Sequence, residues 1–440
     1  FAPSVGALFR VTASGGEAVP LTQVSPPHET SHRFPQFLPD GRRFLYFVQG
    51  STESQGVYLA SIDEPTGKRL FGADAHAVFA APDTLLFLRQ GTAFAQRLDV
   101  AAGVMTGDPI EVANQVMFDG AFNTSALSAS ATGLIAYRTG STNALLWVDR
   151  SGKPIESVTA LEPGSQNCPE ISLDGRRVAL DRTVAGNRDI WLLDLSRGVP
   201  TRFTFDSGID ATPLWSPDGT RIAFRSNRTG VNQIYVKASN PAATEEKLAT
   251  LDLGVGVSDW SRDGRTILFA ALDPVTALDL YALPVTGDRT PVPVARTPFE
   301  ERDGQFSPNG RWIAYASNES GRMEVYVQGF PEPGERWQVS TTGGSQPRWR
   351  GDGSELYYVA ATGMLTAASF RAATTGASPL TGTPVALFAA RIVSAQGGLL
   401  RHQYAVTADG TRFLLNAVAE GAASAPITVI ANWRGFTTGR

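Results

Sequence analysis

The sequence predicts an all-β protein, a β-propeller of about nine four-stranded blades. The first observation is a repeated phrase, which reads "ISLDGRRVAL" at 171–180, "WSPDGTRIAF" at 215–224, "WSRDGRTILF" at 260–269 and "FSPNGRWIAY" at 306–315. The second is its period. The Asp or Asn before each Gly falls at 174, 218, 263, 309 and 352, so the gaps are 44, 45, 46 and 43 residues. The third is that no segment shows helical periodicity over a useful length.

Further copies of the phrase complete the count of units. "FLPDGRRFLYF" at 37–47 places Asp40 134 residues before Asp174, which is about three periods. Two degenerate copies lie in that interval, "FAAPDTLLFL" at 79–88 and "LSASATGLIAY" at 127–137. Eight units therefore begin near residues 34, 76, 121, 167, 210, 256, 301 and 345, and a ninth with three evident strands spans 402–433.

Each unit is expected to contain four short strands. In the unit from 210 these are "TPLWS", "TRIAFRS", "QIYVKAS" and "KLAT". The unit from 301 repeats the order with "GQFS", "RWIAYAS", "EVYVQG" and "RWQVS". Short runs rich in Ile, Val, Tyr, Phe and Trp, broken by Gly, Pro and Asn, are typical of antiparallel meanders. One such sheet cannot bury both of its faces, so we expect the units to stack radially.

The repeated phrase is expected to be structural. Its Asp-Gly or Asn-Gly pair supplies the turn between the first two strands, because Gly adopts positive φ at little cost. The acidic turn residues are expected to cap their own turns rather than to bind metal: Asp40, Asp174, Asp218, Asp263, Asp352 and Asp409. The large residue three positions before the Asp or Asn is expected to fill the gap between blades: Trp215, Trp260, Phe306 and Trp349.

The units are expected to form two rings. The copies over 167–433 are regular and six in number, and a strand at 155–159 would close a six-bladed ring. This divides the chain into 1–160, the N-terminal blades of an incomplete propeller truncated at its N-terminus, and 161–440, a C-terminal six-bladed propeller. The alternative is one nine-bladed ring, in which 1–22 and 402–433 share a blade.

Composition excludes several classes of partner. The chain has 38 basic and 42 acidic residues and a net charge of −4, so attraction to nucleic acid or to an anionic membrane is not predicted. The single Cys168 excludes an internal disulfide framework and a Cys-rich metal cluster. No apolar run approaches the roughly 18 residues of a membrane span. We therefore expect a monomeric domain without membrane contact of its own.

Longer motifs resemble known families. "WSPDGTRIAFRSNRTGVNQIYV" and "FSPNGRWIAYASNESGRMEVYVQGFP" resemble the WD40-like (PD40) repeats of TolB-type propellers. "ETSHRFPQFLPDGRRFLYF", "DIWLLDLSRGVPTRFTFD", "GSQPRWRGDGSELYYVA" and "PITVIANWRGF" resemble the propeller region after the kinase domain of bacterial membrane-bound serine/threonine kinases. That resemblance covers almost the whole chain and implies an upstream kinase, a membrane tether and an extracytoplasmic propeller. The kinase motifs themselves are absent here, so no kinase activity is expected of this chain.

The sequence does not support two familiar catalytic motifs, of which one occurs in an unsuitable context and the other is absent. "HETSH" at 28–32 fits the zinc-peptidase pattern, which needs both His on one face of a helix. Pro26 and Pro27 precede it and "RFPQF" follows, so a loop entering a strand is expected. A serine hydrolase would need a Gly-x-Ser-x-Gly elbow, and the chain has none. We therefore expect no catalytic, cofactor-binding or metal-binding residue and no enzymatic activity.

The expected binding site is the mouth of the channel, where the first strand of each blade begins. Residues placed just before those strands are His32, Arg33, Asp210, Asp259, Arg302, Asp303, Gln346 and Arg348. A ring of mixed charge suits a protein loop or a peptide. The sequence thus predicts a sensor or protein-interaction region of a larger bacterial signalling protein. The alternatives are the propeller of a prolyl-oligopeptidase-type peptidase and a TolB-like periplasmic scaffold.

Overall fold

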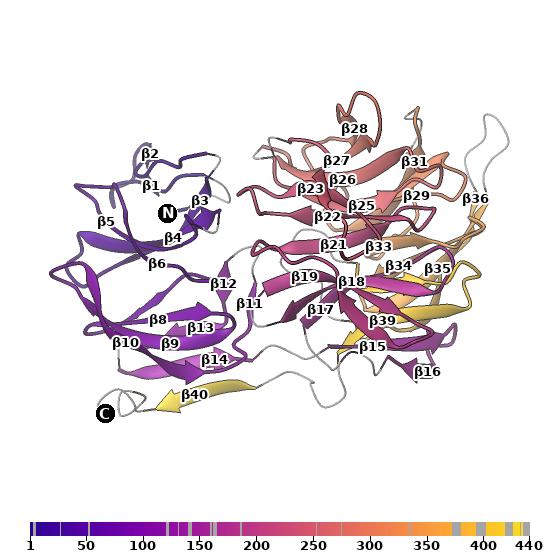
Figure 1. Cartoon of the computed structure of the whole chain (residues 1–440). Coiled ribbons are helices and arrows are strands. Elements are labelled where there is room, and N and C mark those ends of the chain that lie inside the picture. Colours follow the sequence, from indigo (N-terminus) through magenta and orange to yellow (C-terminus); the bar gives the residue numbers. More distant parts are fainter. Residues whose placement is uncertain are drawn as a thin grey trace.

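The computed structural model describes the chain except for residues 3–5, 27, 52, 120–122, 131, 140–142, 159–160, 162–164, 185–186, 252, 274, 333, 335, 372–379, 393–401, 419–425, 432 and 434–440. The described residues form forty strands and no helix. The strands are arranged in two lobes of sheets (Figure 1). The predicted all-β fold with four-stranded, propeller-type blades is confirmed.

The N-terminal lobe contains three larger sheets. The first pairs β3 (Glu29–Phe37), β4 (Arg43–Gly50), β5 (Gly56–Ser61) and β6 (Lys68–Phe71) in sequence order. The second pairs β7 (Val78–Ala80), β8 (Thr84–Arg89), β9 (Thr92–Asp99) and β10 (Val104–Ala113). The third pairs β13 (Leu127–Ala129), β14 (Leu134–Arg138) and β40 (Ile427–Ala431). Two small pairs complete the lobe: β1 (Phe9–Arg10) with β2 (Val19–Pro20), and β11 (Phe118–Asp119) with β12 (Thr124–Ser125).

The second lobe contains six sheets, here numbered as blades one to six. Blade one is β17 (Ser165–Ile171), β18 (Arg177–Val184), β19 (Asn187–Asp194) and β20 (Val199–Arg202). Blade two is β21 (Asp210–Trp215), β22 (Arg221–Ser226), β23 (Gln233–Ala238) and β24 (Glu245–Lys247). Blade three is β25 (Val255–Trp260), β26 (Thr266–Asp273), β27 (Ala277–Pro284) and β28 (Val292–Ala295). Blade four is β29 (Glu301–Phe306), β30 (Trp312–Ser317), β31 (Glu324–Gly329) and β32 (Arg336–Gln338).

Blades five and six depart from the simple sequential order. Blade five is β33 (Gly344–Trp349), β34 (Glu355–Ala360) and β35 (Met364–Arg371), with β36 (Leu380–Thr381) and β37 (Val385–Ala389) both paired to β35. Blade six joins β38 (Tyr404–Val406) and β39 (Arg412–Val418) to β15 (Asn143–Asp149) and β16 (Pro154–Ser157). The innermost strands contact one another in the order β17, β21, β25, β29, β33, β38 and back to β17. The six blades therefore form a closed ring.

The ring is closed by strands from two distant parts of the sequence. Strand β15 pairs along its whole length with β39, from Asn143 opposite Val418 to Asp149 opposite Arg412. The sequence places the closing strand at 155–159. In the structure β16 ends at Ser157, residues 159–160 lie outside the described residues, and β15 contributes as well. Closure of this kind removes the exposed sheet edge between the first and the last blade.

The ninth repeat supplies two strands of blade six, which strands from 143–157 complete, whereas its third strand leaves the ring. Its first two strands, β38 and β39, complete blade six, whereas its third strand, β40, pairs with β14 in the N-terminal lobe. Figure 1 shows this yellow strand beneath the violet sheets of that lobe. Residues 1–22 do not share a blade with 402–433, because β1 pairs with β2. The repeats predict a closing strand at 155–159, but they contain no signal for the pairing of β40 with β14.

These pairings also bear on the predicted boundary between residues 160 and 161. The sheet of blade six joins 143–157 to 404–418, and β40 joins the end of the chain to the N-terminal lobe, so both pairings cross that boundary. The division into two folding domains itself stays a prediction. Among the described residues, none lies in a helix long and apolar enough to span a membrane.

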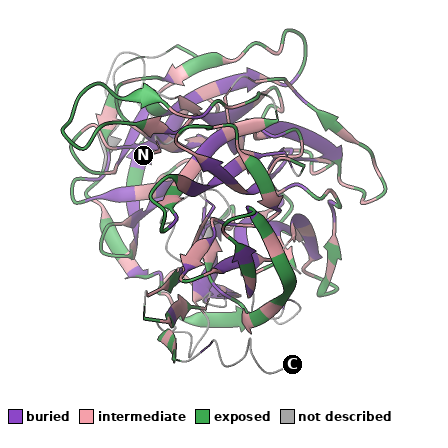
Figure 2. Cartoon of the chain, turned by 90° about the vertical axis from the view of Figure 1, so that its left-hand side faces the viewer, coloured by how far each residue is buried: buried purple, intermediate pink, exposed green. Residues whose placement is uncertain are grey.

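The blades are held together by large side chains between neighbouring sheets. Trp215 packs with Ile190 of blade one, and Trp260 packs with Ile234 of blade two. Phe306 and Trp349 occupy the same position between blades three and four and between four and five. The predicted role of these residues is confirmed. Figure 2 shows the buried residues along the strands and many exposed ones in the connecting turns.

A β-bulge interrupts the first strand of each of blades one to five. Pairing with the second strand stops and then resumes at Glu170, Leu214, Asp259, Gln305 and Arg348. Four of these bulges contain a non-glycine residue at positive φ: Cys168, Thr212, Asp303 and Gln346. Bulges redirect the side chains that follow them and recur next to functional sites. Here they determine which side chains reach the end of the channel.

Candidate binding site at the channel mouth

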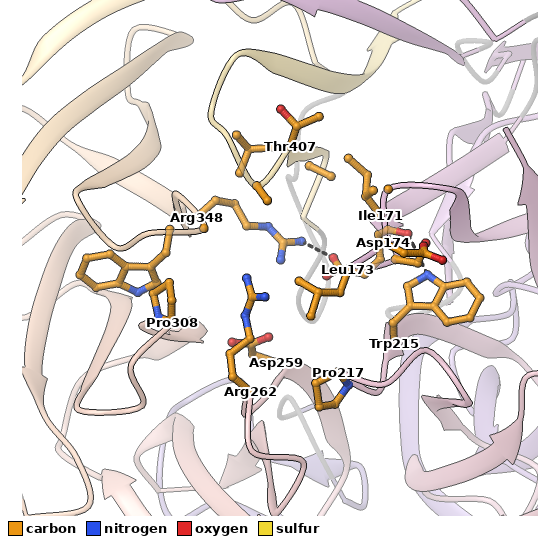
Figure 3. A pocket seen from close by; sticks show the side chains of 18 of the residues that line it. Ile171, Leu173, Asp174, Trp215, Pro217, Asp259, Arg262, Pro308, Arg348 and Thr407 are labelled. Atoms are coloured by element: carbon orange, nitrogen blue, oxygen red, sulfur yellow. Dashed lines mark hydrogen bonds and ion pairs between the residues drawn. The ribbon is translucent and has the colours of Figure 1, made fainter. Parts of the chain in front are cut away.

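The end of the ring channel at which the first strands finish is hollowed into a cavity of about 420 Å³. Its wall consists of the last residues of β17, β21, β25, β29, β33 and β38 and of the turns that follow them. In Figure 3 the side chains of Arg348 and Arg262 point toward the middle of this cavity. All six blades therefore contribute to one site.

Five of the six rim turns are fixed by their own aspartate, as the sequence predicts, and Asn309 fixes the turn of blade four in the same way. In blade two, Ser216 Oγ donates to Asp218 Oδ1 at 2.6 Å, and the backbone N–H of Thr220 donates to the same oxygen at 3.0 Å. These hydrogen bonds lower the pKa of Asp218 to about 2. Four further rim acids accept the backbone N–H two residues on: Asp174, Asp263, Asp352 and Asp409. Asp40 makes the same hydrogen bond in the N-terminal lobe. The turns around the mouth are thus preorganised.

One position of the phrase, the residue before the Asp or Asn, lines the cavity in every blade. Its six occupants are Leu173, Pro217, Arg262, Pro308, Gly351 and Ala408. Five of the six carry no charge. The two prolines also hold φ near −65° and offer no backbone N–H, which adds to the stiffness of the rim. At this position of the phrase the rim is therefore uncharged except for the guanidinium group of Arg262.

The floor of the cavity comes from the residue before the aromatic position of the phrase. These residues are Glu170, Asp259, Gln305, Arg348 and Ala405, and four of them follow the bulges described above. Their polar groups are fixed by neighbouring blades. Gln305 Oε1 accepts the backbone N–H of Trp349 at 2.8 Å, and Asp259 Oδ2 accepts that of Phe306 at the same distance.

An ion pair spans the floor. Arg348 Nη2 donates to Glu170 Oε2 at 2.8 Å, and only 5 % of the Arg348 side chain is exposed. Asp259 interacts electrostatically with both of these groups. Burial, and then repulsion by the Glu170 carboxylate, raise the pKa of Asp259 to about 7. The charge of the floor therefore changes near neutral pH.

The arrangement suits recognition of a charged or polar group. A buried and hydrogen-bonded pair at the floor gives a fixed electrostatic pattern, while the exposed Arg262 has no ion pair with any residue that the structure describes. Within the described part of the chain, no three His, Cys, Asp or Glu side chains gather as a metal site. A few rigid polar groups that converge in a preformed cavity are typical of binding sites.

A second cavity, of about 1020 Å³, lies between the two lobes. Asp74 and Arg89 line it from the N-terminal lobe, and Asn187, Phe205 and Asn227 line it from the ring. Unlike the channel mouth, it is not built from equivalent positions of successive blades. The mouth is therefore the better candidate.

The sequence-predicted site residues do not form one site, because His32 and Arg33 belong to the N-terminal lobe and the other six to the ring. The prediction placed them just before the first strands, whereas the structure places all eight within strands: His32 and Arg33 in β3, Asp210 in β21, Asp259 in β25, Arg302 and Asp303 in β29, and Gln346 and Arg348 in β33. Placement before the strands was wrong because those strands begin earlier than their apolar residues suggest. Only Asp259 and Arg348 line the cavity, at the opposite end of the strands from the one expected.

Several of the remaining residues link elements of the ring. Asp210 is fully buried, and both of its oxygens accept from Arg228 Nη2 at 3.0 Å. Asp303 Oδ2 accepts the backbone N–H of Gln346 at 3.1 Å, and Gln346 Oε1 accepts that of Gln403 at 2.8 Å. These bonds tie blades four, five and six together inside the channel. A role of these residues in ligand binding stays a prediction.

The "HETSH" segment has the extended structure that its prolines suggest. Strand β3 starts at Glu29, so the helix that a zinc-peptidase motif requires is not formed. His32 Nδ1 lies 2.8 Å from Thr22 Oγ1, and its Nε2 lies 3.3 Å from Glu29 Oε2. Arg33 Nε donates to Ser31 Oγ at 3.1 Å. Both predicted residues thus contact their own lobe.

Sequence reasoning missed Glu170 and Arg262. Each occupies a fixed position of the repeated phrase, so an alignment of the copies contains the signal. Arg262 is the one charged residue where the other blades of the ring have Leu, Pro, Gly or Ala. Glu170 occupies the position of Asp259 and Arg348.

The fold and the cavity define a β-propeller, and part of the chain is similar to a known propeller family. The family model described as the TolB beta propeller domain matches residues 130–276. The TolB homolog of Chlorobaculum tepidum is 30 % identical over 116 residues, which cover 26 % of this chain and 26 % of that protein. The predicted resemblance to TolB-type repeats is therefore confirmed.

Other similarities are more distant. The uncharacterized peptidase YuxL of Bacillus subtilis is 28 % identical over 166 residues, 36 % of this chain and 25 % of that protein. The chain thus matches only about a quarter of the length of each of these two relatives. A solved TolB-like structure from Agrobacterium tumefaciens is 17 % identical with a TM-score of 0.47, covering 63 % of this chain and 98 % of its own.

Proposed function

We propose that this chain is a non-catalytic binding module that recognises a protein loop or a peptide at the channel mouth of its six-bladed ring. The observation that carries the proposal is the cavity of about 420 Å³, to which every blade contributes equivalent positions. Ligand pockets commonly have volumes of about 300–1,000 Å³, and largely preformed walls reduce the entropic cost of binding. The aspartate-capped turns supply such walls. That the site is non-catalytic rests on the absence of hydrolase and kinase motifs from the sequence.

We further propose that the module is the sensing region of a larger bacterial signalling protein, on the extracytoplasmic side of the membrane. The motifs that resemble the propeller region of membrane-bound serine/threonine kinases support this role. Binding at the mouth would be passed to an upstream kinase through the tether. The test is the coding sequence upstream of residue 1: kinase motifs followed by an apolar span support the proposal, and a signal peptide followed by more repeats contradicts it.

A specific observation favours a second candidate function. The 166-residue similarity to a peptidase fits a propeller that controls access to a hydrolase domain. A hydrolase encoded beside this region would support that function. A TolB-like scaffold without an attached enzyme is the remaining alternative, which the upstream signal peptide would favour.

The binding proposal is tested with a library of short random peptides displayed on phage. The whole chain is used for selection, and the affinities of the selected peptides are then measured. Ala408 is exposed and lines the cavity, so Ala408→Trp fills the mouth without a change in the core. Ala242→Trp is the matched control, because Ala242 is exposed outside the cavity.

We expect Ala408→Trp to weaken binding at least tenfold and Ala242→Trp to leave it unchanged. Thermal unfolding of both variants should match the native chain, since neither position is buried. If no peptide is selected, or if Ala408→Trp binds as tightly as the native chain, the channel mouth is not the recognition site.

A further inference from the structure

Arg262 distinguishes one side of the channel mouth from the rest. Blades one, two, four, five and six present Leu, Pro, Pro, Gly and Ala at the equivalent rim position. Nothing in the turn itself requires Arg, because the same turn forms with each of these residues. The Asp263 cap is made as in the other blades, with Ser261 Oγ donating at 2.6 Å and Arg265 N–H at 3.0 Å. The Arg262 side chain is therefore free for another purpose.

The surroundings of Arg262 leave its charge uncompensated. Glu170 already pairs with Arg348, and Asp259 holds the backbone N–H of Phe306. The rim acids Asp174 and Asp409 accept hydrogen bonds within their own turns. Arg262 makes no ion pair with a described residue, and its guanidinium points toward the centre of the cavity (Figure 3). Five N–H donors in a planar fork thus face the space that a ligand would fill.

The other charged side chains that line the cavity already have partners of their own. The cavity is lined by three arginines, Arg262, Arg348 and Arg412, and by four acids, Glu170, Asp174, Asp259 and Asp409. Arg412 stacks over Trp147, with 5.0 Å between the guanidinium carbon and the ring centroid. Each acid has at least one hydrogen-bond partner. Arg262 is the one charged side chain of this set that meets the cavity without a partner.

We propose that the mouth selects an acidic peptide segment, in which an Asp or Glu side chain pairs with Arg262 while neighbouring apolar side chains contact the rim. This inference rests on the proposed binding function and names the chemistry of its ligand. Arginine binds carboxylates through two parallel hydrogen bonds, which gives both affinity and orientation. Leu173, Pro217 and Pro308 supply the apolar contacts, and 46 % of the Leu173 side chain is exposed.

The experiment extends the peptide selection to variants of Arg262. The probes are selected acidic peptides and copies in which Glu is replaced by Gln and Asp by Asn. Arg262→Glu reverses the charge at the rim, and Arg262→Lys keeps the charge but removes the planar fork. Arg265→Glu is the matched control, because Arg265 is an exposed residue of the same turn that does not line the cavity.

We expect the native chain to select peptides rich in Asp and Glu beside apolar residues. Hydrogen bonds to charged groups contribute strongly to the free energy of binding, so Arg262→Glu should lower the affinity for acidic peptides about tenfold or more. The peptides with Gln and Asn should bind the native chain more weakly by a similar factor. Arg262→Lys should bind with intermediate affinity, and selection on Arg262→Glu should return basic peptides. Arg265→Glu should behave like the native chain.

The failure of this inference differs from the failure of the proposed function. One outcome would overturn the acidic-ligand inference alone. In that outcome the selected peptides bind the native chain and bind Ala408→Trp more weakly, but they carry no net charge or bind Arg262→Glu as tightly as the native chain. Peptides insensitive to Ala408→Trp would overturn both. Arg262 is exposed, so loss of folding is not expected to confuse the result, and thermal unfolding of each variant checks this directly.

Discussion

Arg348 of β33 donates a hydrogen bond of 2.8 Å to Glu170 of β17, although 178 residues and the whole of blade six separate the two strands. The pair spans the channel floor between blades that are not neighbours in the ring. It forms because a β-bulge precedes each residue and redirects the side chain toward the channel end. The floor of the candidate site therefore depends on ring closure.

Arg348→Met is expected to destabilise the ring, because it leaves the Glu170 carboxylate, whose side chain is only 19 % exposed, without its cation. Breaking a buried pair from one side commonly costs about 3–5 kcal/mol. The double variant Arg348→Met, Glu170→Gln should lose less free energy of unfolding than Arg348→Met alone, because position 170 then carries no unpaired charge. Urea unfolding followed by tryptophan fluorescence measures the difference.

Arg42 provides the control for this cycle. It pairs with Asp63 at the surface, where 64 % and 58 % of the two side chains are exposed. Exposed pairs contribute about 0–1 kcal/mol, so Arg42→Met should have little effect. Equal losses for Arg348→Met and Arg42→Met would show that the floor pair is not structurally important.

Asp259→Asn is expected to change how stability depends on pH. The pKa of Asp259 is raised from 3.8 to about 7 in the folded chain, so the folded state keeps a proton that the unfolded state releases. The contribution of Asp259 to the stability of the native state therefore falls as pH rises from about 4 to about 7 and is then constant. The Asn variant lacks this loss, so its stability relative to the native chain should rise over the same interval.

The pKa of Asp218 is shifted in the opposite direction, so Asp218→Asn serves as a comparison. Its pKa is lowered from 3.8 to about 2, so its stabilising contribution is complete above about pH 4 and is lost as the pH falls toward 2. Asp218→Asn should therefore alter the profile only in acid. Free energies of unfolding measured in urea across pH 2 to 8 test both variants, and parallel profiles for Asp259→Asn and the native chain would contradict the raised pKa.

A fragment of residues 143–418 is expected to fold as a closed ring by itself. It contains both halves of blade six, whereas a fragment cut at the sequence-predicted boundary, 161–440, lacks β15 and β16. In the second fragment β39 becomes an exposed edge strand. The apolar residues that form a buried cluster with Leu145 and Trp147 become exposed to solvent. Open apolar edges promote aggregation.

Calorimetry and size-exclusion chromatography compare the two fragments. We expect 143–418 to be monomeric with one cooperative transition near that of the ring in the whole chain. Residues 161–440 should unfold at lower temperature or aggregate. A more stable 161–440 fragment would show that blade six does not need β15 and β16, and that the predicted boundary is the physical one.

Sequence reasoning reached the fold because the determinants of a blade are local. Asp-Gly turns, alternating apolar residues and a large side chain three positions before the turn all lie within about ten residues of one another. Trp215, Trp260, Phe306 and Trp349 were placed correctly between blades for this reason. Each repeat copy confirmed the others, which made the period reliable.

The candidate site was only partly predictable, because its position depends on contacts between blades. Asp259 and Arg348 were singled out, but at the wrong end of their strands, and Glu170 and Arg262 were missed. Strand starts were inferred from apolar residues, whereas polar residues such as Asp210 and Glu301 begin their strands. The bulges that direct the floor residues have no sequence signal in a single chain.

The sequence by itself determined the all-β class, the blade period, the capped turns and the side chains between blades, because each depends on a short stretch of chain. The sequence also predicted that a strand at 155–159 closes the ring. Only the tertiary structure decided that β15 takes part in this closure and that β40 joins the N-terminal lobe. Any apolar strand can pair with any other of matching length. Which partner it takes depends on where ring closure brings the chain, and that same closure brings Arg348 to Glu170.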